Sequence, residues 1–155
     1  MMKSFFIGNL EVKLPIVQGG MGVGVSLSGL ASAVANEGGV GVISCAGLGL
    51  IHKGHGDFLQ NCIWGLQEEL RIAREKTTGI IGVNIMVALS NFADMARTAI
   101  AEKADIIFAG AGLPLDLPLY KTADSETKLV PIVSSARAAK VICEKWYLNY
   151  NYLPV

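Results

Sequence analysis

Apolar runs recur along this chain at nearly regular intervals, and each run is followed by small or polar residues and then by a helix-like stretch. The runs begin near residues 15, 40, 80, 105 and 129, so three of the four spacings are 24 or 25 residues. Strands that alternate with helices in this way indicate βαβ units with right-handed crossovers. Parallel strands covered on both faces must be apolar, and 52% of the 155 residues are hydrophobic while 17% are charged. We therefore expect a single α/β domain whose parallel strands lie in sequential order.

Boundary residues place the individual elements. A hairpin is predicted over residues 5–13, with Gly8-Asn9 as its turn. Strands are predicted over residues 15–18, 40–44, 80–87, 105–109 and 129–134, and a glycine-rich loop over 45–57. Helices are predicted over residues 26–36, 58–78, 92–103 and 136–147, with N-caps at Ser26 or Ser28, Ser90 or Asn91, and Ser135.

Charge and cysteine content argue against several classes of partner. The chain has 13 basic and 13 acidic residues and no basic patch, so we expect no nucleic-acid partner. Its three cysteines show no metal-binding spacing and are predicted to be free thiols without a metal site. Residues 14–36 carry no charge but are dense in glycine and serine, which favours a strand and a helix over a membrane span. The N-terminus has no signal-peptide core, and a cytoplasmic location is expected.

The predicted strands all end in glycine or in small or polar residues. Parallel α/β proteins bind their ligands at the carboxyl ends of the strands. Five such ends facing one mouth favour a planar ligand lying across it. The most glycine-rich of them is the first, where Gln18 is followed by Gly19, Gly20, Met21 and Gly22. Glycine has no Cβ and allows a backbone to approach a ligand closely.

Four motifs in register resemble one known family. QGGMG, GVNIM, AGAGLP and PIVSSARAAK occur in this order between residues 14 and 140. They resemble nitronate monooxygenase, formerly 2-nitropropane dioxygenase, whose family includes the flavin-dependent enoyl-acyl-carrier-protein reductases. The resemblance implies a (β/α)8 barrel of the TIM type that holds FMN at its carboxyl-terminal mouth.

The same resemblance implies that only part of the barrel is present. Family members are roughly twice as long, in line with a complete eight-stranded barrel. The family's GGHxG-type loop, which carries the catalytic histidine, has no match here, and neither do the phosphate-binding glycine loops of the last strands. We therefore expect residues 1–155 to be the N-terminal part of an FMN-binding barrel with about five of its eight units. The chain would be a fragment, a truncated gene product or one half of a split barrel.

Within this family framework, the predicted cofactor contacts are Gln18, Gly19, Gly20, Met21, Gly22, Asn84, Gly110 and Ser134. Gly20, Met21 and Gly22 are expected along the flavin ring. Asn84 is an amide in an otherwise apolar strand, and its ability to donate and accept suits the pyrimidine edge of a flavin. For Gly20 to Gly22 the alternative is a plain glycine turn, and for Asn84 it is a hydrogen bond to a nearby loop.

Further positions each allow a functional and a purely structural interpretation. Gly110 would leave room for flavin or substrate, or belong to an ordinary turn. Either Ser134 or Ser135 would reach the ligand, and the alternative for Ser135 is to cap the next helix. His52 and His55 lie in a loop expected at the mouth, although solvated loop histidines are commoner.

The function implied by the resemblance is FMN-dependent oxidation of nitronates with oxygen. One alternative is an enoyl reductase that uses NAD(P)H. Another is a non-catalytic half-barrel that needs a partner. Open sheet edges with few charges predict self-association or pairing with the missing C-terminal half.

Overall fold

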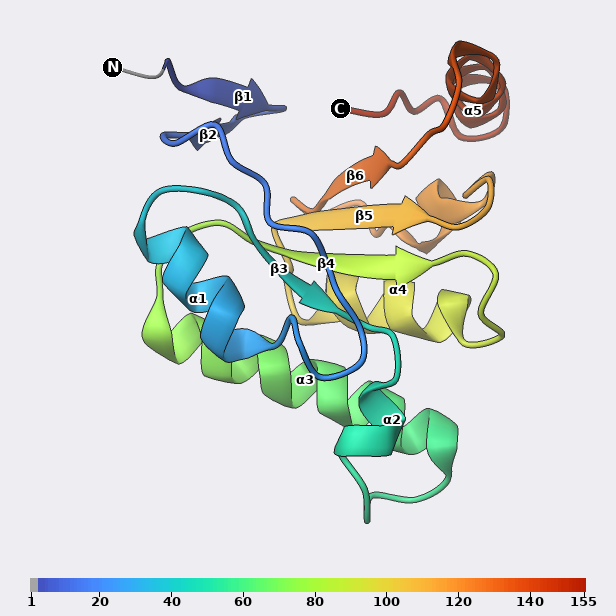
Figure 1. The fold of residues 1–155 in the computed structure, drawn as a ribbon. Helices are drawn as coiled ribbons and strands as arrows, with labels where there is room; N and C mark the ends of the chain where they lie inside the picture. The colour runs from blue at the N-terminus through green and yellow to red at the C-terminus, as the bar shows by residue number, and fades with distance from the viewer. Residues whose placement is uncertain (1–2) are drawn as a thin grey trace.

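The structure is a computed structural model that describes residues 3–155, and its fold is α/β (Figure 1). An antiparallel hairpin, β1 (Phe5–Ile7) and β2 (Leu10–Val12), comes first and turns at Gly8-Asn9 as predicted. The main sheet has four parallel strands in the order β3-β4-β5-β6, namely β3 (Gly41–Ser44), β4 (Ile81–Met86), β5 (Ile106–Gly110) and β6 (Lys128–Pro131). The predicted parallel, sequential order is therefore confirmed.

The helices follow the strands in alternation. They are α1 (Ser28–Asn36), α2 (Leu48–Ile51), α3 (Phe58–Lys76), α4 (Phe92–Ala101), the 3-10 helix η1 (Leu117–Tyr120) and α5 (Ala136–Tyr150). In Figure 1, α1, α3 and α4 lie on one side of the sheet, and the hairpin lies on the other. Within residues 3–155, no helix is both long and apolar enough to cross a membrane.

The strand predicted over residues 15–18 is reduced to one parallel bridge, between Val17 and Val40. The Val40 amide donates to Ile16 at 2.9 Å, and the Gln18 amide donates to Val40 at 3.0 Å. Backbone pairing with β3 stops at Gln18, and the glycines Gly19 and Gly20 follow. The segment thus takes the predicted place beside β3, but it is shorter than predicted.

Side chains of the sheet alternate between two separate cores. Ile43, Val83 and Ile107 join the larger core, which includes buried residues of α1, α3, α4 and α5. Val42 and Ile106 point to the opposite face, here called the inner face, and cluster there with Ile7 and Val12 of the hairpin. This alternation is the period of two that a strand imposes.

Capping residues mark the starts of α3 and α5, and both helices begin where the sequence predicts. The side chain of Asp57 accepts from the Gln60 amide and the Gln60 side chain accepts from the Asp57 amide, which forms a capping box at the start of α3. Ser135 caps α5 by accepting from the Ala138 amide at 3.2 Å, as predicted. The C-cap of α3 is Thr77, so the helix ends two residues before the predicted end at residue 78.

Two predictions of local structure were wrong. The predicted loop 45–57 contains the one-turn helix α2, which is too short to show a helical period in the sequence. Neither Ser26 nor Ser28 caps α1. Its N-cap is Leu27, and the Ser28 amide donates instead to Glu69 of α3. A partner 41 residues away is invisible to a local capping pattern.

Candidate functional site

The side chain of Gln18 extends the pairing of the first strand. Its Nε2 donates to the Val42 carbonyl at 3.0 Å, and its Oε1 accepts from the Val42 amide at 3.2 Å. The amide group thereby replaces the next backbone rung along β3. Nε2 also lies 3.0 Å from Oγ of Ser26. The amide of this predicted cofactor contact is thus already bonded within the chain.

Ser26 holds the glycine loop, defined here as residues 18–26. Its hydroxyl accepts from the Met21 amide at 2.9 Å and donates to the Gly19 carbonyl at 3.0 Å. Its backbone amide donates to Met21 and its carbonyl accepts from Ser44 of β3, both at 2.9 Å. Ser26 is 1% exposed. The sequence suggested only a helix cap here, although a hydroxyl that closes a glycine run is a signal that the loop is tied down by its own side chain.

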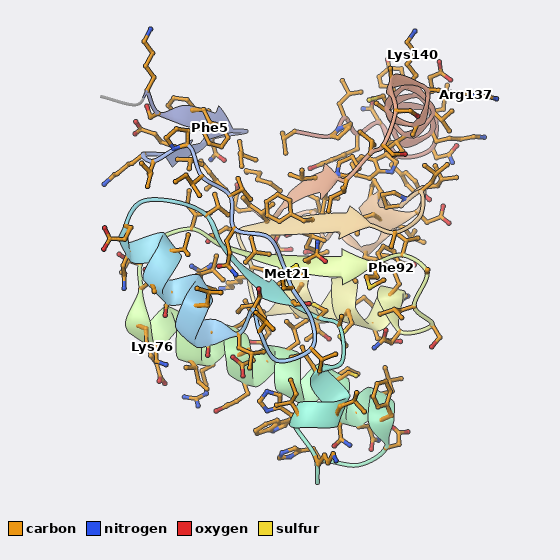
Figure 2. All side chains as sticks on the ribbon, in the orientation of Figure 1. Phe5, Met21, Lys76, Phe92, Arg137 and Lys140 are labelled. Carbon is orange, nitrogen blue, oxygen red and sulfur yellow. The ribbon has the colours of Figure 1, made fainter. Side chains whose placement is uncertain are left out.

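Gly20 and Gly22 bring this loop into direct contact with the strand ends. A Cβ on Gly20 would lie 2.4 Å from Cβ of Asn84, and a Cβ on Gly22 would lie 2.8 Å from Cβ of Ala46. Gly19, in contrast, has nothing within 4 Å of such an atom. The Met21 side chain is 61% exposed, and Figure 2 shows it on the loop that crosses in front of the sheet.

Asn84 is half-buried on β4, in register between Ser44 of β3 and Phe108 of β5. Its backbone carbonyl accepts from Cys45 at 3.0 Å. Its side-chain amide makes no hydrogen bond to any residue of the described chain, 3–155. The Phe108 ring lies nearby over Gly82, where a Cβ would be 2.8 Å from Cε2 of the ring. The inner face therefore presents an accessible amide beside an aromatic surface, with the glycine loop over it.

Gly110 and Ser134 lie on the same carboxyl edge but on other strands. Gly110 is buried, and a Cβ on it would lie 3.0 Å from Cβ of Ile132. The Gly110 carbonyl accepts from the Val87 amide at 2.8 Å. Ser134 is exposed beyond the end of β6. The structure thus brings Gln18 to Gly22 together with Asn84, and it places Gly110 in strand packing.

Both loop histidines contact α3. Nε2 of His52 lies 3.0 Å from Oε1 of Glu69, and the His55 ring stacks on Trp64 with the ring centroids 3.6 Å apart. These contacts give each ring a structural role.

Cys45 directly follows β3 and is buried, and burial together with the neighbouring Cys62 raises the pKa of its thiol. Packing, as expected, accounts for it. Within residues 3–155, no three His, Cys, Asp or Glu side chains are placed to hold a metal ion.

Two hollows open at the other end of the strands. One, of about 640 Å³, is lined by residues that precede β5 and β6, including Asp105 and Thr127. The second, of about 370 Å³, lies beside Gly38, Gly39 and Gly79. Neither contains a residue of the glycine loop or Asn84. We place the candidate site at the carboxyl edge, because an unpartnered amide and a close glycine loop occur there together.

The chain is similar to a known protein family and to several solved structures. The family model for nitronate monooxygenase matches residues 3–104. No curated protein matches the chain. Among solved structures, FabK from Thermotoga maritima superposes with a TM-score of 0.68 at 27% identity, over 86% of this chain and 38% of that one.

A nitroalkane oxidase from Streptomyces ansochromogenes superposes with a TM-score of 0.63 at 17% identity, over 85% of this chain and 44% of that one. The chain thus spans less than half the length of either protein. These matches, with the sequential parallel sheet, confirm the prediction of a partial TIM-type barrel. Because the matched region covers most of its residues, the chain belongs to the nitronate monooxygenase family.

Proposed function

We propose that this chain supplies the ring-binding side of an FMN-dependent oxidoreductase. The observation that carries the proposal is the free amide of Asn84 beneath Gly20 of the glycine loop. Because this amide is accessible and makes no hydrogen bond within residues 3–155, it is available to a ligand with matching donors and acceptors. The pyrimidine edge of a flavin offers both.

The residues present fit the ring of FMN better than its phosphate. Met21 offers an exposed apolar side chain to a ring face. The N-terminus of α1, which would otherwise attract a phosphate, is already occupied by the carboxylate of Glu69 at 2.7 Å. Barrels of this type usually bind phosphate at the loops after strands seven and eight. FMN, when bound, supplies the exchange of reducing equivalents, while Asn84 and the glycine loop bind and orient its ring.

For the substrate we propose a nitronate that is oxidised with oxygen, because the family model that matches is that of nitronate monooxygenase. The second candidate is an enoyl thioester reduced with NAD(P)H, and the likeness to FabK at 27% identity favours it. The test is turnover by the complete barrel with each substrate. Consumption of oxygen with a nitronate supports the first candidate, and oxidation of NADH with an enoyl thioester supports the second.

We further propose that the chain pairs with another chain or with the remaining barrel units. Ile16 and Val17 are 47% and 42% exposed at one end of the sheet, and Ile132 and Val133 are 49% and 42% exposed at the other. Unpaired strand edges with apolar side chains favour such pairing. Light scattering after size exclusion, with a visible spectrum, tests both proposals. A monodisperse yellow monomer with stoichiometric FMN would contradict the pairing and the need for further units. A cytoplasmic location stays a prediction for cell fractionation to test.

A further inference from the structure

Glu69 of α3 is a buried carboxylate that uses both of its oxygens. It is 5% exposed. Oε2 accepts from the Ser28 amide at 2.7 Å, and Oε1 lies 3.0 Å from Nε2 of His52. A carboxylate is rarely buried unless it is paired and hydrogen-bonded, because desolvation of its charge is costly. These contacts join the start of α1 and the end of α2 to one side chain.

The first of these contacts lies next to the glycine loop. Ser28 is two residues beyond Ser26, whose hydroxyl and backbone hold Gly19, Met21 and Ser44. No side chain of its own segment caps α1, and its first turn has no acidic residue. The carboxylate of Glu69 therefore satisfies a buried backbone amide at this helix start and complements the positive end of the helix dipole.

The second contact fixes the element on the other flank of the loop. The His52 ring packs on α3, where a Cβ on Gly65 would lie 2.8 Å from Cδ2 of the ring. His52 is the C-cap of α2. Residues next to and within α2 touch the loop in turn: a Cβ on Gly47 would lie 2.6 Å from the Val23 side chain, and one on Gly24 would lie 3.3 Å from Ile51.

We propose that Glu69 is a positioning residue for the glycine loop, acting from behind the sheet through Ser28 and His52. It does not touch the ligand. It sets where the glycine loop lies over the strand ends, and it keeps the start of α1 closed to anionic ligands. Its relevance to FMN rests on the proposed function, but the positioning itself is measurable on the chain without a cofactor.

Hydrogen exchange of the loop amides tests the proposal. The amides of Met21, Ser26 and Ser44 all donate hydrogen bonds in this network. In Glu69→Ala, we expect these three to exchange roughly tenfold faster or more, because their protection depends on local opening. Amides in β5 should keep their protection. The control is Glu75→Ala on the same helix, where the side chain is 61% exposed and pairs with Arg71.

A conservative variant separates positioning from folding. Glu69→Gln keeps an acceptor for the Ser28 amide and should restore most of the loop protection. Unchanged loop exchange in Glu69→Ala would overturn the proposal. So would equal acceleration of loop and β5 amides in both Glu69 variants, because that would show general destabilisation.

Ser28 offers an independent pair of variants if Glu69→Ala does not fold. Ser28→Pro removes the amide that donates to Glu69, and proline is tolerated at the first position of a helix. Leu27, which precedes it, is already extended with φ −111° and ψ −176°, as a residue before proline should be. Ser28→Ala keeps the amide and is the matched control. Faster loop exchange in Ser28→Pro alone supports the proposal, and equal exchange in both contradicts it.

The outcome is independent of the cofactor assignment. If loop amides exchange faster in Glu69→Ala but the complete barrel with the parent sequence binds no FMN, the positioning role is retained and the proposed function is removed. If loop exchange in Glu69→Ala equals that of the parent chain while the complete barrel binds FMN, the positioning role is removed and the proposed function is retained.

Discussion

Gly20 lies so close to Asn84 that a Cβ on the glycine would stand 2.4 Å from the Cβ of the asparagine. Glycine is required at this position by the approach of the loop to β4. The contact also fixes the depth at which the free amide lies below the loop. Two residues 64 positions apart thus define the candidate site together.

We predict that Gly20→Ala displaces the glycine loop. Overpacking of this kind typically costs about 1–3 kcal/mol, and urea unfolding would measure the loss. Gly19→Ala is the matched control, because a Cβ there meets nothing within 4 Å. Equal stability of the two variants would contradict the close approach.

Asn84→Ala should weaken flavin binding by the complete barrel about two- to tenfold, since one net hydrogen bond is worth about 0.5–1.5 kcal/mol. Titration with FMN followed by flavin fluorescence measures the change. Asn91→Ala is the control, because the Asn91 side chain makes no capping bond at the start of α4. Unchanged affinity in Asn84→Ala, with the fold intact by circular dichroism, would remove Asn84 from the site.

Gln18→Ala should destabilise the chain by about 1–3 kcal/mol, because it leaves both backbone groups of Val42 without the partner they now have. Chemical denaturation measures this. The control is Gln67→Ala, whose side chain makes one exposed contact with Glu102. If the two variants lose stability equally, the Gln18 side chain does not act as a rung of the sheet.

The thiol of Cys45 should resist alkylation. Burial raises its pKa, so the reactive thiolate does not form in the folded chain at ordinary pH. Cys143 is only half-buried and should react first with iodoacetamide, as peptide mass spectrometry would show. The raised pKa of the Cys45 thiol also makes stability depend on pH. The protonated thiol contributes fully to the free energy of unfolding below the thiol pKa of the unfolded chain, and this contribution falls as the pH rises above that pKa. Faster labelling of Cys45 than of Cys143 would contradict this arrangement.

A charge at the open end of the sheet should reduce association. Val133 follows β6 and is 42% exposed, and Val133→Lys places a charge beside an unpaired edge. Light scattering should show a smaller mean mass than for the parent chain. Leu148→Lys, on the 75% exposed side chain of α5, is the control. A mass that falls only in the control variant would place the contact surface on α5 instead.

Features that depend on local composition were predicted from the sequence. The apolar runs gave the parallel sheet, because buried strands need such runs, and Ser135 marked the start of α5. Features that depend on distant partners were not. Ser26 serves the glycine loop rather than α1, and Glu69 caps α1 from 41 residues away. The close approach of Gly20 to Asn84 likewise needed the three-dimensional arrangement, although each residue had been singled out alone.

The hairpin determines which part of the inner face is open to a ligand. Ile7 and Val12 pack with Val40, Val42 and Ile106 at the amino-terminal part of the inner face. These apolar side chains cover the amino-terminal part of the inner face. The free amide of Asn84 therefore lies toward the opposite, carboxyl edge of the inner face, where Gly20 of the glycine loop is its neighbour.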